Sequence, residues 1–338
     1  MRLKGFRAQG GGNSADLNSC WQPRQARLCL TLNQPWPNRR LKSPLVDLDS
    51  LAALDGLQWL RTVTEVASRF NISPPTVSRH TKKCLNLFGL RLERINGEWI
   101  TLGDRSILHM ERHVHQTARW LGYRPLRLEA TYWSGPLLCT PAPQGWMLGL
   151  CNIVGIQRNF QLVRERIVDA CITGLPDLPA SNDKELMSIQ LSSMPVFFVA
   201  NPEHPIRQTH QLAYSDIAMY PTLGLPEGAY PAVQRSLQSI GLWNDVVRMS
   251  RYRQSLWEGK SEAELTIGYG TALSMEISGA NLIRLPLHCP FVSGEALVVR
   301  REWLDHPRLV DLRHTILQRL VPWTQKHPEI NLCNGPNS

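Results

Sequence analysis

The sequence predicts a multidomain fold: a small, mainly α-helical domain, a linker helix, and a larger α/β domain. Its 338 residues are too many for one domain of average size. Residues 47–103 carry short apolar patterns of helical period, followed by a hairpin signal. Residues 126–322 alternate short apolar strands with helices, which is typical of α/β domains. A helix over residues 104–122 is expected to join the two domains.

Composition excludes several classes of protein. Hydrophobic residues make up 43% of the chain, yet no apolar run is long enough to span a bilayer. The N-terminus lacks the apolar segment of a secretory signal, so we expect a cytoplasmic protein with no membrane partner. The eight cysteines form no C-x-x-C pair, and we expect no metal and no cofactor. Cys171 lies in an apolar run and is interpreted as a buried small hydrophobic residue.

The formal net charge of +9 is concentrated in one segment of the chain. Residues 1–46 hold eight basic residues and one acidic residue, which leaves only +2 for all the rest. This segment has no sustained period and contains a triple glycine, so it is interpreted as a disordered basic extension or as upstream sequence from an early start codon. The overall basicity is therefore weak evidence for nucleic-acid binding.

Residues 63–82 meet the demands of a helix-turn-helix. Asn71 lies at the turn and tolerates a left-handed backbone, while Ser73 suits the N-cap and Pro74 the first position of the second helix. The apolar positions that would pack two crossing helices are Val66, Ala67, Phe70, Ile72 and Val77. An ordinary amphipathic helix pair with a solvated basic face is the alternative interpretation.

The next segment favours the DNA-binding interpretation. Asn96-Gly97 lies between strand-forming residues at 92–101, and this dipeptide is the strongest short signal for a hairpin. A hairpin placed directly after a helix-turn-helix is expected to act as a wing. In such a unit the second helix enters the major groove, with Arg79 as the candidate base-reading residue and the lysines on phosphates. The predicted DNA-binding residues are Ser73, Pro75, Thr76, Ser78, Arg79, Lys82, Lys83, Arg91 and Arg94.

The predicted linker helix opens at Gly103-Asp104, with Asp104 as its N-cap. Its apolar residues recur at helical spacing on an otherwise polar surface, which indicates pairing with an identical helix. The predicted dimerisation residues are Ile107, Met110, Val114 and Leu121. His109 and His113 stand four apart, but they do not form an H-E-x-x-H motif and are interpreted as solvated.

In this order, the elements resemble the LysR-type transcriptional regulators over residues 47–322. Segments similar to the family's motifs are Leu126–Ala130, Asp169–Pro176, Phe197–Ile206 and Gly268–Gly270. The resemblance implies a type 2 periplasmic-binding-protein-like domain of two lobes. Lobe I would comprise residues 126–200 and 290–322, lobe II residues 201–289, and residues 323–338 would form a flexible tail. Predicted strands are 126–130, 147–153, 167–172, 195–200, 221–225, 264–269, 281–285 and 294–300, in largely parallel sheets.

The resemblance also implies a homodimer or homotetramer on double-stranded promoter DNA, with RNA polymerase as a further partner. A small-molecule effector would bind between the lobes, and helix N-termini there would suit an anionic metabolite. The implied effector-binding residues are Trp133, Ser134, Val154, Gly155, Gly174, Pro226, Gly228, Gly268 and Tyr269. Pro136, Pro141 and Pro143 break the helix that usually follows the family's first effector strand, so a degenerate sensor domain is an open alternative.

Two other functions compete with regulation. An enzyme is disfavoured, because we find no G-x-S-x-G, no P-loop, no H-E-x-x-H and no convincing acid/base pair. A ligand-binding or interaction protein with a degenerate DNA-binding domain is the second alternative. The sequence favours a sequence-specific DNA-binding regulator with no catalytic residues.

Overall fold

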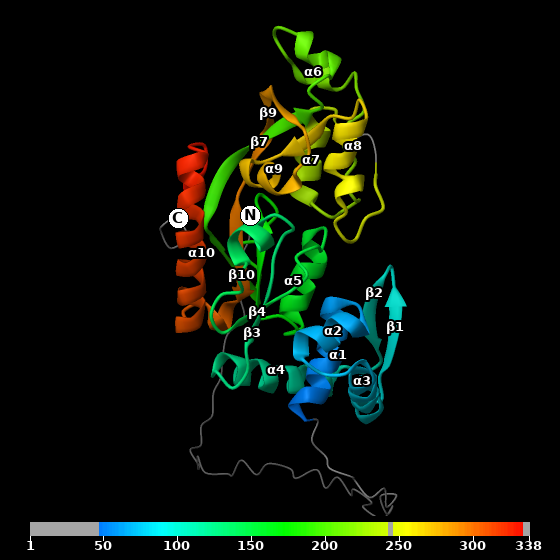
Figure 1. Ribbon diagram of the computed structural model, residues 1–338. Coiled ribbons are helices and arrows are strands. Elements are labelled where there is room, and N and C mark those ends of the chain that lie inside the picture. Colours follow the sequence, from blue (N-terminus) through cyan, green and yellow to red (C-terminus); the bar gives the residue numbers. More distant parts are fainter. Residues whose placement is uncertain (1–46, 243–245, 334–338) are drawn as a thin grey trace, which may run out of the picture. The chain divides into compact units, whose positions relative to one another are not determined.

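Three helices and a two-stranded hairpin form the first part of the structure. The computed structural model describes residues 47–242 and 246–333, so the predicted extension 1–46 lies outside the described residues (Figure 1). The elements here are α1 (Leu48–Leu60), α2 (Val63–Phe70), α3 (Pro74–Phe88), β1 (Arg91–Ile95) and β2 (Glu98–Leu102). They lie where the sequence predicts helices, a turn and a hairpin.

Local chemistry explains these boundaries. Thr62 accepts from the Glu65 N–H and caps α2, and Asn71 ends that helix with φ at 54°. The Ser73 side chain caps α3 by accepting from the Thr76 N–H, with Pro74 at the first helical position. In the hairpin, Asn96 and Gly97 have φ of 50° and 82°, as a type I′ turn requires.

The linker helix α4 spans Ser106–Trp120 and buries one face. Its N-cap differs from the prediction by one residue: Arg105 occupies the N-cap, and Asp104 Oδ1 accepts from the Ser106 N–H at 3.0 Å. The buried face is largely polar and consists of Leu108, Arg112, His115, Gln116, Arg119 and Trp120. A buried polar face of this kind needs fixed partners, which the neighbouring elements supply.

Lobe I is built on a five-stranded sheet in the order β4-β3-β5-β10-β6. Its strands are β3 (Leu126–Glu129), β4 (Trp146–Leu148), β5 (Ala170–Gly174), β6 (Leu186–Gln190) and β10 (Glu295–Arg300). The expectation of largely parallel sheets is wrong, because among the strand pairs described only β3–β4 and β3–β5 are parallel. Strand β10 returns to lobe I from the opposite direction, and it pairs antiparallel with both β5 and β6.

Side chains of this sheet point alternately to its two faces, and both faces are buried. Leu126 and Leu128 pack with α10 (Pro307–Lys326), through Leu309, Leu312, Ile316 and Leu320. Cys171 and Val298 point the other way, toward α5 (Ile156–Arg164) and the N-terminal helices. That second core contains Phe160 and Val163 of α5 together with Leu57, Trp59, Val66 and Val77. The N-terminal helices and lobe I therefore share one apolar core.

Lobe II is organised around β7 (Ser192–Ala200), which pairs with β8 (Gly268–Gly270), β9 (Ile283–Ser293) and β11 (Asn331–Leu332). Its helices are α6 (Tyr214–Ile217), α7 (Pro231–Ser239), α8 (Glu258–Ala263) and α9 (Ala272–Ser278). Met194 packs in the core of lobe I and Phe198 in that of lobe II, so β7 crosses between the lobes. By its pairing β7 belongs to the second sheet.

Several predicted boundaries change in the structure. Residues 221–225 form only isolated bridges at Thr222 and Leu225, and strand β6 was not predicted. The expectation of a flexible tail from residue 323 is wrong for the residues described there. Helix α10 runs to Lys326, and Asn331–Leu332 pair with β7, because Trp323, Ile330 and Leu332 pack on the core of lobe I.

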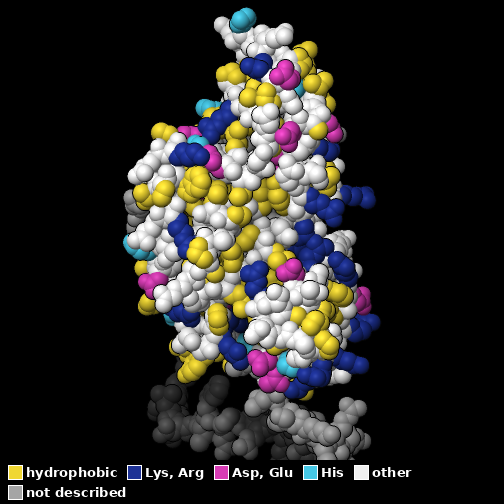
Figure 2. Space-filling view, in the orientation of Figure 1, with side chains coloured by type: hydrophobic (Ala, Val, Ile, Leu, Met, Phe, Trp, Pro, Cys, Tyr) yellow, Lys and Arg dark blue, Asp and Glu magenta, His cyan; other side chains and the backbone are white. Residues whose placement is uncertain are grey.

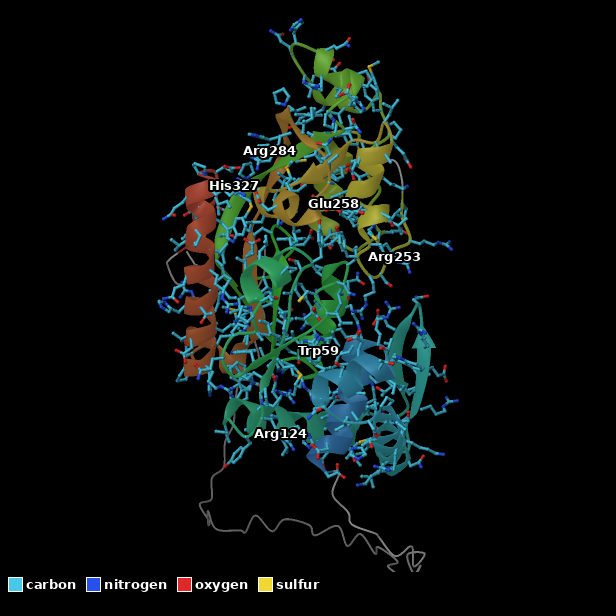
Figure 3. The ribbon with its side chains drawn as sticks, viewed as in Figure 1. Trp59, Arg124, Arg253, Glu258, Arg284 and His327 are labelled. Carbon is cyan, nitrogen blue, oxygen red and sulfur yellow. The ribbon has the colours of Figure 1, made fainter. Side chains whose placement is uncertain are left out.

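Buried polar contacts join the N-terminal helices to lobe I. Trp59 of α1 donates from Nε1 to Glu129 Oε2 of β3 at 2.6 Å, and both residues are fully buried (Figure 3). The Arg112 guanidinium of α4 binds Asp55 Oδ1 of α1 at 2.8 Å and Glu165 Oε2 at 3.0 Å. Arg119 Nε binds Asp169 Oδ2 at 2.7 Å.

Replacing Arg112 with Met should lower the free energy of unfolding by about 3–5 kcal/mol, because Asp55 and Glu165 would lose a buried counter-ion. The matched control is Arg124→Met, since Arg124 pairs with Asp49 on the surface with both side chains more than half exposed. That change should cost less than about 1 kcal/mol. Urea unfolding of both variants checks this, and equal losses would contradict it.

Candidate nucleic-acid interface and ligand cavity

Helix α3 buries one side and exposes a basic one. Val77, Thr81 and Cys84 are buried, whereas the predicted DNA-binding residues on this helix are exposed apart from Thr76, which is half-buried. The exposed set is Ser73, Pro75, Ser78, Arg79, Lys82 and Lys83. In Figure 2, Lys and Arg side chains gather along the edge where α3 and the hairpin lie in Figure 1.

Two basic side chains on the exposed side of α3 have no acidic partner among the described residues. Lys83 forms an ion pair with Asp47, and Ser73 Oγ bonds the Thr76 hydroxyl at 2.8 Å while capping the helix. Arg79 contacts only Thr76 Oγ1, at 3.4 Å. Within residues 47–242 and 246–333, neither Arg79 nor Lys82 has an acidic partner. Both charges are available to a ligand.

The hairpin exposes Arg91 and Arg94 on its first strand. Arg91 lies 3.9 Å from Glu93, and Arg94 donates to the Gly97 carbonyl at 3.3 Å while its guanidinium lies over the Trp99 ring. These contacts are weak and surface-exposed, so they hold neither arginine firmly.

Glu98 on the second strand of the hairpin was not singled out from the sequence. Arg251 binds it in a bidentate manner, with Nε and Nη2 at 3.1 and 2.9 Å. Arg158 and Arg61 lie at 3.5 and 3.7 Å from the same carboxylate. No local pattern indicates a pairing between residues 153 positions apart in the chain.

The predicted dimerisation residues form an exposed apolar stripe on α4. The exposed fractions are 58% for Ile107, 64% for Met110, 63% for Val114 and 68% for Leu121. The last three lie around a shallow hollow together with Ala118 and Tyr123. His109 and His113 belong to no metal-binding cluster among the described residues.

His115 lies on the buried face of the same helix and is 7% exposed. Burial lowers the pKa of His115 to about 4, and the positive charges of Arg119 and Arg127 act in the same direction. Its Nε2 is 3.7 Å from Glu111 Oε2. The folded protein therefore holds this imidazole neutral at pH values where an unfolded chain would protonate it.

His115 should make stability depend on pH, since its folded pKa lies below its unfolded value of about 6.5. Its contribution is complete above pH ~6.5, is lost as the pH falls toward 4, and reaches up to about 3 kcal/mol. His115→Asn should flatten urea-unfolding stability between pH 7 and 4. The control His113→Asn, on the exposed face, should keep the wild-type dependence. Identical profiles for all three proteins would contradict the assignment.

A cavity of about 110 Å³ lies between the sheets of the two lobes. Four predicted effector-binding residues line it: Trp133, Val154, Gly174 and Tyr269. The other five do not, namely Ser134, Gly155, Pro226, Gly228 and Gly268. Ser134 is buried against the Thr131 hydroxyl, and Gly155 forms the positive-φ turn before α5. Those residues shape the backbone around the cavity.

Aromatic residues that the sequence did not single out complete the cavity. Tyr132 and Tyr252 stack with ring centroids 3.6 Å apart, and both hydroxyls donate to the Glu258 carboxylate at 2.7 Å. Glu258 lies at the start of α8 (Figure 3). Burial raises the pKa of Glu258, and the two tyrosine hydrogen bonds oppose that shift. Only the tertiary fold brings Tyr132 and Tyr252 together.

The two lobes are bonded directly to each other around the cavity. The Ile156 N–H donates to the Ala229 carbonyl at 2.9 Å, and the Val154 N–H donates to the Ser250 carbonyl at 3.1 Å. Asp177 of lobe I accepts from the Ala232 and Val233 N–H groups at the start of α7. These hydrogen bonds hold the two lobes together next to the cavity.

Comparison with known proteins gives similarity to solved structures. No family model matches the sequence, and no curated protein does. The chain is similar to a full-length OxyR variant from Pseudomonas aeruginosa, with a TM-score of 0.49 and 18% identity over 80% of this chain and 94% of that one. Full-length CbnR in complex with its target DNA gives 0.49 and 13%, over 81% and 99%. Full-length BenM gives 0.45 and 18%, over 82% and 97%. These are LysR-type regulators, the family that the sequence resembles.

None of the described helices is long and apolar enough to cross a membrane. The cysteines described are free, and Cys171 is buried. Burial raises the pKa of Cys171 above its ordinary value, which disfavours the reactive thiolate. This agrees with its interpretation as a small apolar residue of the core.

Proposed function

We propose that this protein is a sequence-specific, DNA-binding transcriptional regulator of the LysR type. The observation that carries the proposal is the exposed basic side of α3, which follows the positive-φ turn at Asn71 and precedes the Asn96-Gly97 hairpin. This order of elements is that of a winged helix-turn-helix. The N-terminal half of α3 would enter the major groove.

Within this unit the basic side chains suit two kinds of DNA contact, one with a base and the other with phosphates. Arg79 has five guanidinium donors and no acidic partner among the described residues, so it suits bidentate contact with a guanine. Lys82 lies three residues further along the helix and suits a phosphate. Arg91 and Arg94, on the exposed strand of the hairpin, would contact phosphates beside the groove.

The remaining parts of the proposal are oligomerisation and sensing. The stripe Ile107, Met110, Val114 and Leu121 would pair with the same stripe of a second copy, giving a homodimer or a homotetramer. In the proposed division, residues 47–103 bind promoter DNA, 104–122 dimerise, and 126–322 respond to a small effector in the cavity. RNA polymerase would be a further partner at the promoter.

Substituting Arg79 and Lys82 separately tests base reading against phosphate binding. Binding sites are first recovered by in-cell immunoprecipitation and sequencing, then used in mobility-shift titrations. Arg79→Ala should cost about 1–3 kcal/mol and relax preference at one base pair. Lys82→Ala should weaken binding to all sequences and lower the salt dependence.

One result would overturn the DNA-binding proposal: a wild-type binding map without inverted-repeat sites in any nutrient condition. An Arg79→Ala variant that binds every sequence as the wild type does would overturn only the base-reading role of Arg79. If both variants weaken every site equally, base reading by Arg79 is wrong while DNA binding stands.

Val114→Asp should dissociate the proposed dimer, because it places a charge at the centre of an apolar contact. Val310→Asp on α10 is the matched control, since Val310 is 55% exposed and lies outside the stripe. Analytical ultracentrifugation should give a monomer for the first variant and the wild-type mass for the second. A monomeric wild-type protein, or a dimer insensitive to Val114→Asp, would contradict the assignment.

A further inference from the structure

The described lining of the cavity between the lobes carries no charged side chain. None of the 17 described residues that line it is Asp, Glu, Lys, Arg or His. Most are aliphatic or aromatic, and the hydroxyl-bearing ones besides tyrosines are Thr271, Ser274 and Ser293. A charged ligand of either sign would lose its hydration here and find no counter-ion in the wall.

Each helix N-terminus around the cavity has at least one N–H that already donates to an acceptor of the protein. At α7, the Ala232 N–H donates to Asp177 Oδ1 at 2.6 Å and the Val233 N–H to Oδ2 at 3.2 Å. At α5, the Ile156 N–H donates to the Ala229 carbonyl, and at α9 the Ser274 N–H donates to Thr271 Oγ1. These bonds reduce the number of N–H donors left at the three helix N-termini for an anionic metabolite.

Three polar atoms of the aromatic wall are also committed. The hydroxyls of Tyr132 and Tyr252 donate to Glu258, and Trp133 Nε1 donates to Glu295 Oε1 at 2.9 Å. Both carboxylates are buried behind the lining. Ser274 and Thr271 bond each other. Among the described residues the Ser293 hydroxyl makes no hydrogen bond, so it is available to one polar group of a ligand.

The size of the cavity restricts the ligand further. A volume of about 110 Å³ is of the same order as the ~150 Å³ of an engineered apolar cavity that binds benzene. The walls from Tyr132, Trp133 and Phe291 offer aromatic contact for such a ring.

We propose that this cavity binds a small uncharged ring compound with one polar substituent, which the Ser293 hydroxyl recognises. The inference rests on the proposed sensing function of the same cavity and names the class of its ligand. It excludes carboxylates and ammonium compounds as ligands of this site.

Three one-ring probes of matched size test the charge requirement: benzamide, benzoate and benzylammonium, each titrated into the full chain at pH 7. Ligand-observed NMR and calorimetry measure binding. Benzamide should bind at least about tenfold more tightly than either ion, since an uncompensated buried charge costs more than 1.4 kcal/mol. Ser293→Ala should weaken benzamide binding by about tenfold.

The Val233→Trp variant tests whether benzamide binds in the cavity, because the larger side chain fills the space beside α7. Val310→Trp on the exposed side of α10 is the control. Benzamide binding should be lost in the first variant and kept in the second. Equal or tighter binding of benzoate or benzylammonium, binding that survives Val233→Trp, or no binding of benzamide would each overturn the inference.

A measurement of promoter binding on the same wild-type sample distinguishes failure of the proposed ligand class from failure of the proposed function. If the protein shifts its recovered DNA sites but binds no neutral ring, the ligand class is wrong and the regulatory function stands. If it binds benzamide but shifts no DNA, the proposed function fails while the cavity assignment stands.

Discussion

The structure depends on a buried network of arginines and carboxylates between the N-terminal helices, the linker helix and lobe I. Arg112 is fully buried and bonds Asp55 and Glu165, while Arg127 bonds Asp55 Oδ2 at 3.3 Å from β3. Burial lowers the pKa of Arg127 to about 10, which shows how strongly this environment penalises charge. Such pairs persist because removing one partner leaves the other unpaired and buried. They fix which face of α4 turns inward, and thereby leave the apolar stripe exposed.

A second polar connection links the hairpin to the cavity. Glu98 of the hairpin is bound by Arg251, and the next residue, Tyr252, stacks on Tyr132 in the cavity wall. Under the proposed function, a ligand that displaces Tyr252 would disturb the ion pair that holds the hairpin. The aromatic wall and the basic hairpin are thus neighbours through one short segment of lobe II.

Sequence reasoning succeeded where local chemistry decides the outcome. The Asn71 turn, the Ser73 cap and the Asn96-Gly97 hairpin follow from backbone preferences of individual residues, and the exposed stripe of α4 follows from helical spacing. It was less successful for strands, because β10 and β6 pair through contacts far apart in the chain. Of the nine residues expected around the effector, four line the cavity, since loop positions depend on how the lobes pack.

By itself, then, the sequence determined the helices, turns and hairpin of the N-terminal part, the alternation of strands and helices beyond it, and the family resemblance. The tertiary structure alone decided that β7 crosses between the lobes, that residues 323–333 are ordered against lobe I, and that Glu98 meets Arg251. It also decided that the described lining of the cavity carries no charged side chain, and that Asp177 accepts from two N–H groups at the start of α7. The reason is physical: caps and turns are set by neighbours within a few residues, whereas burial and ion pairing are set by partners that only folding brings together.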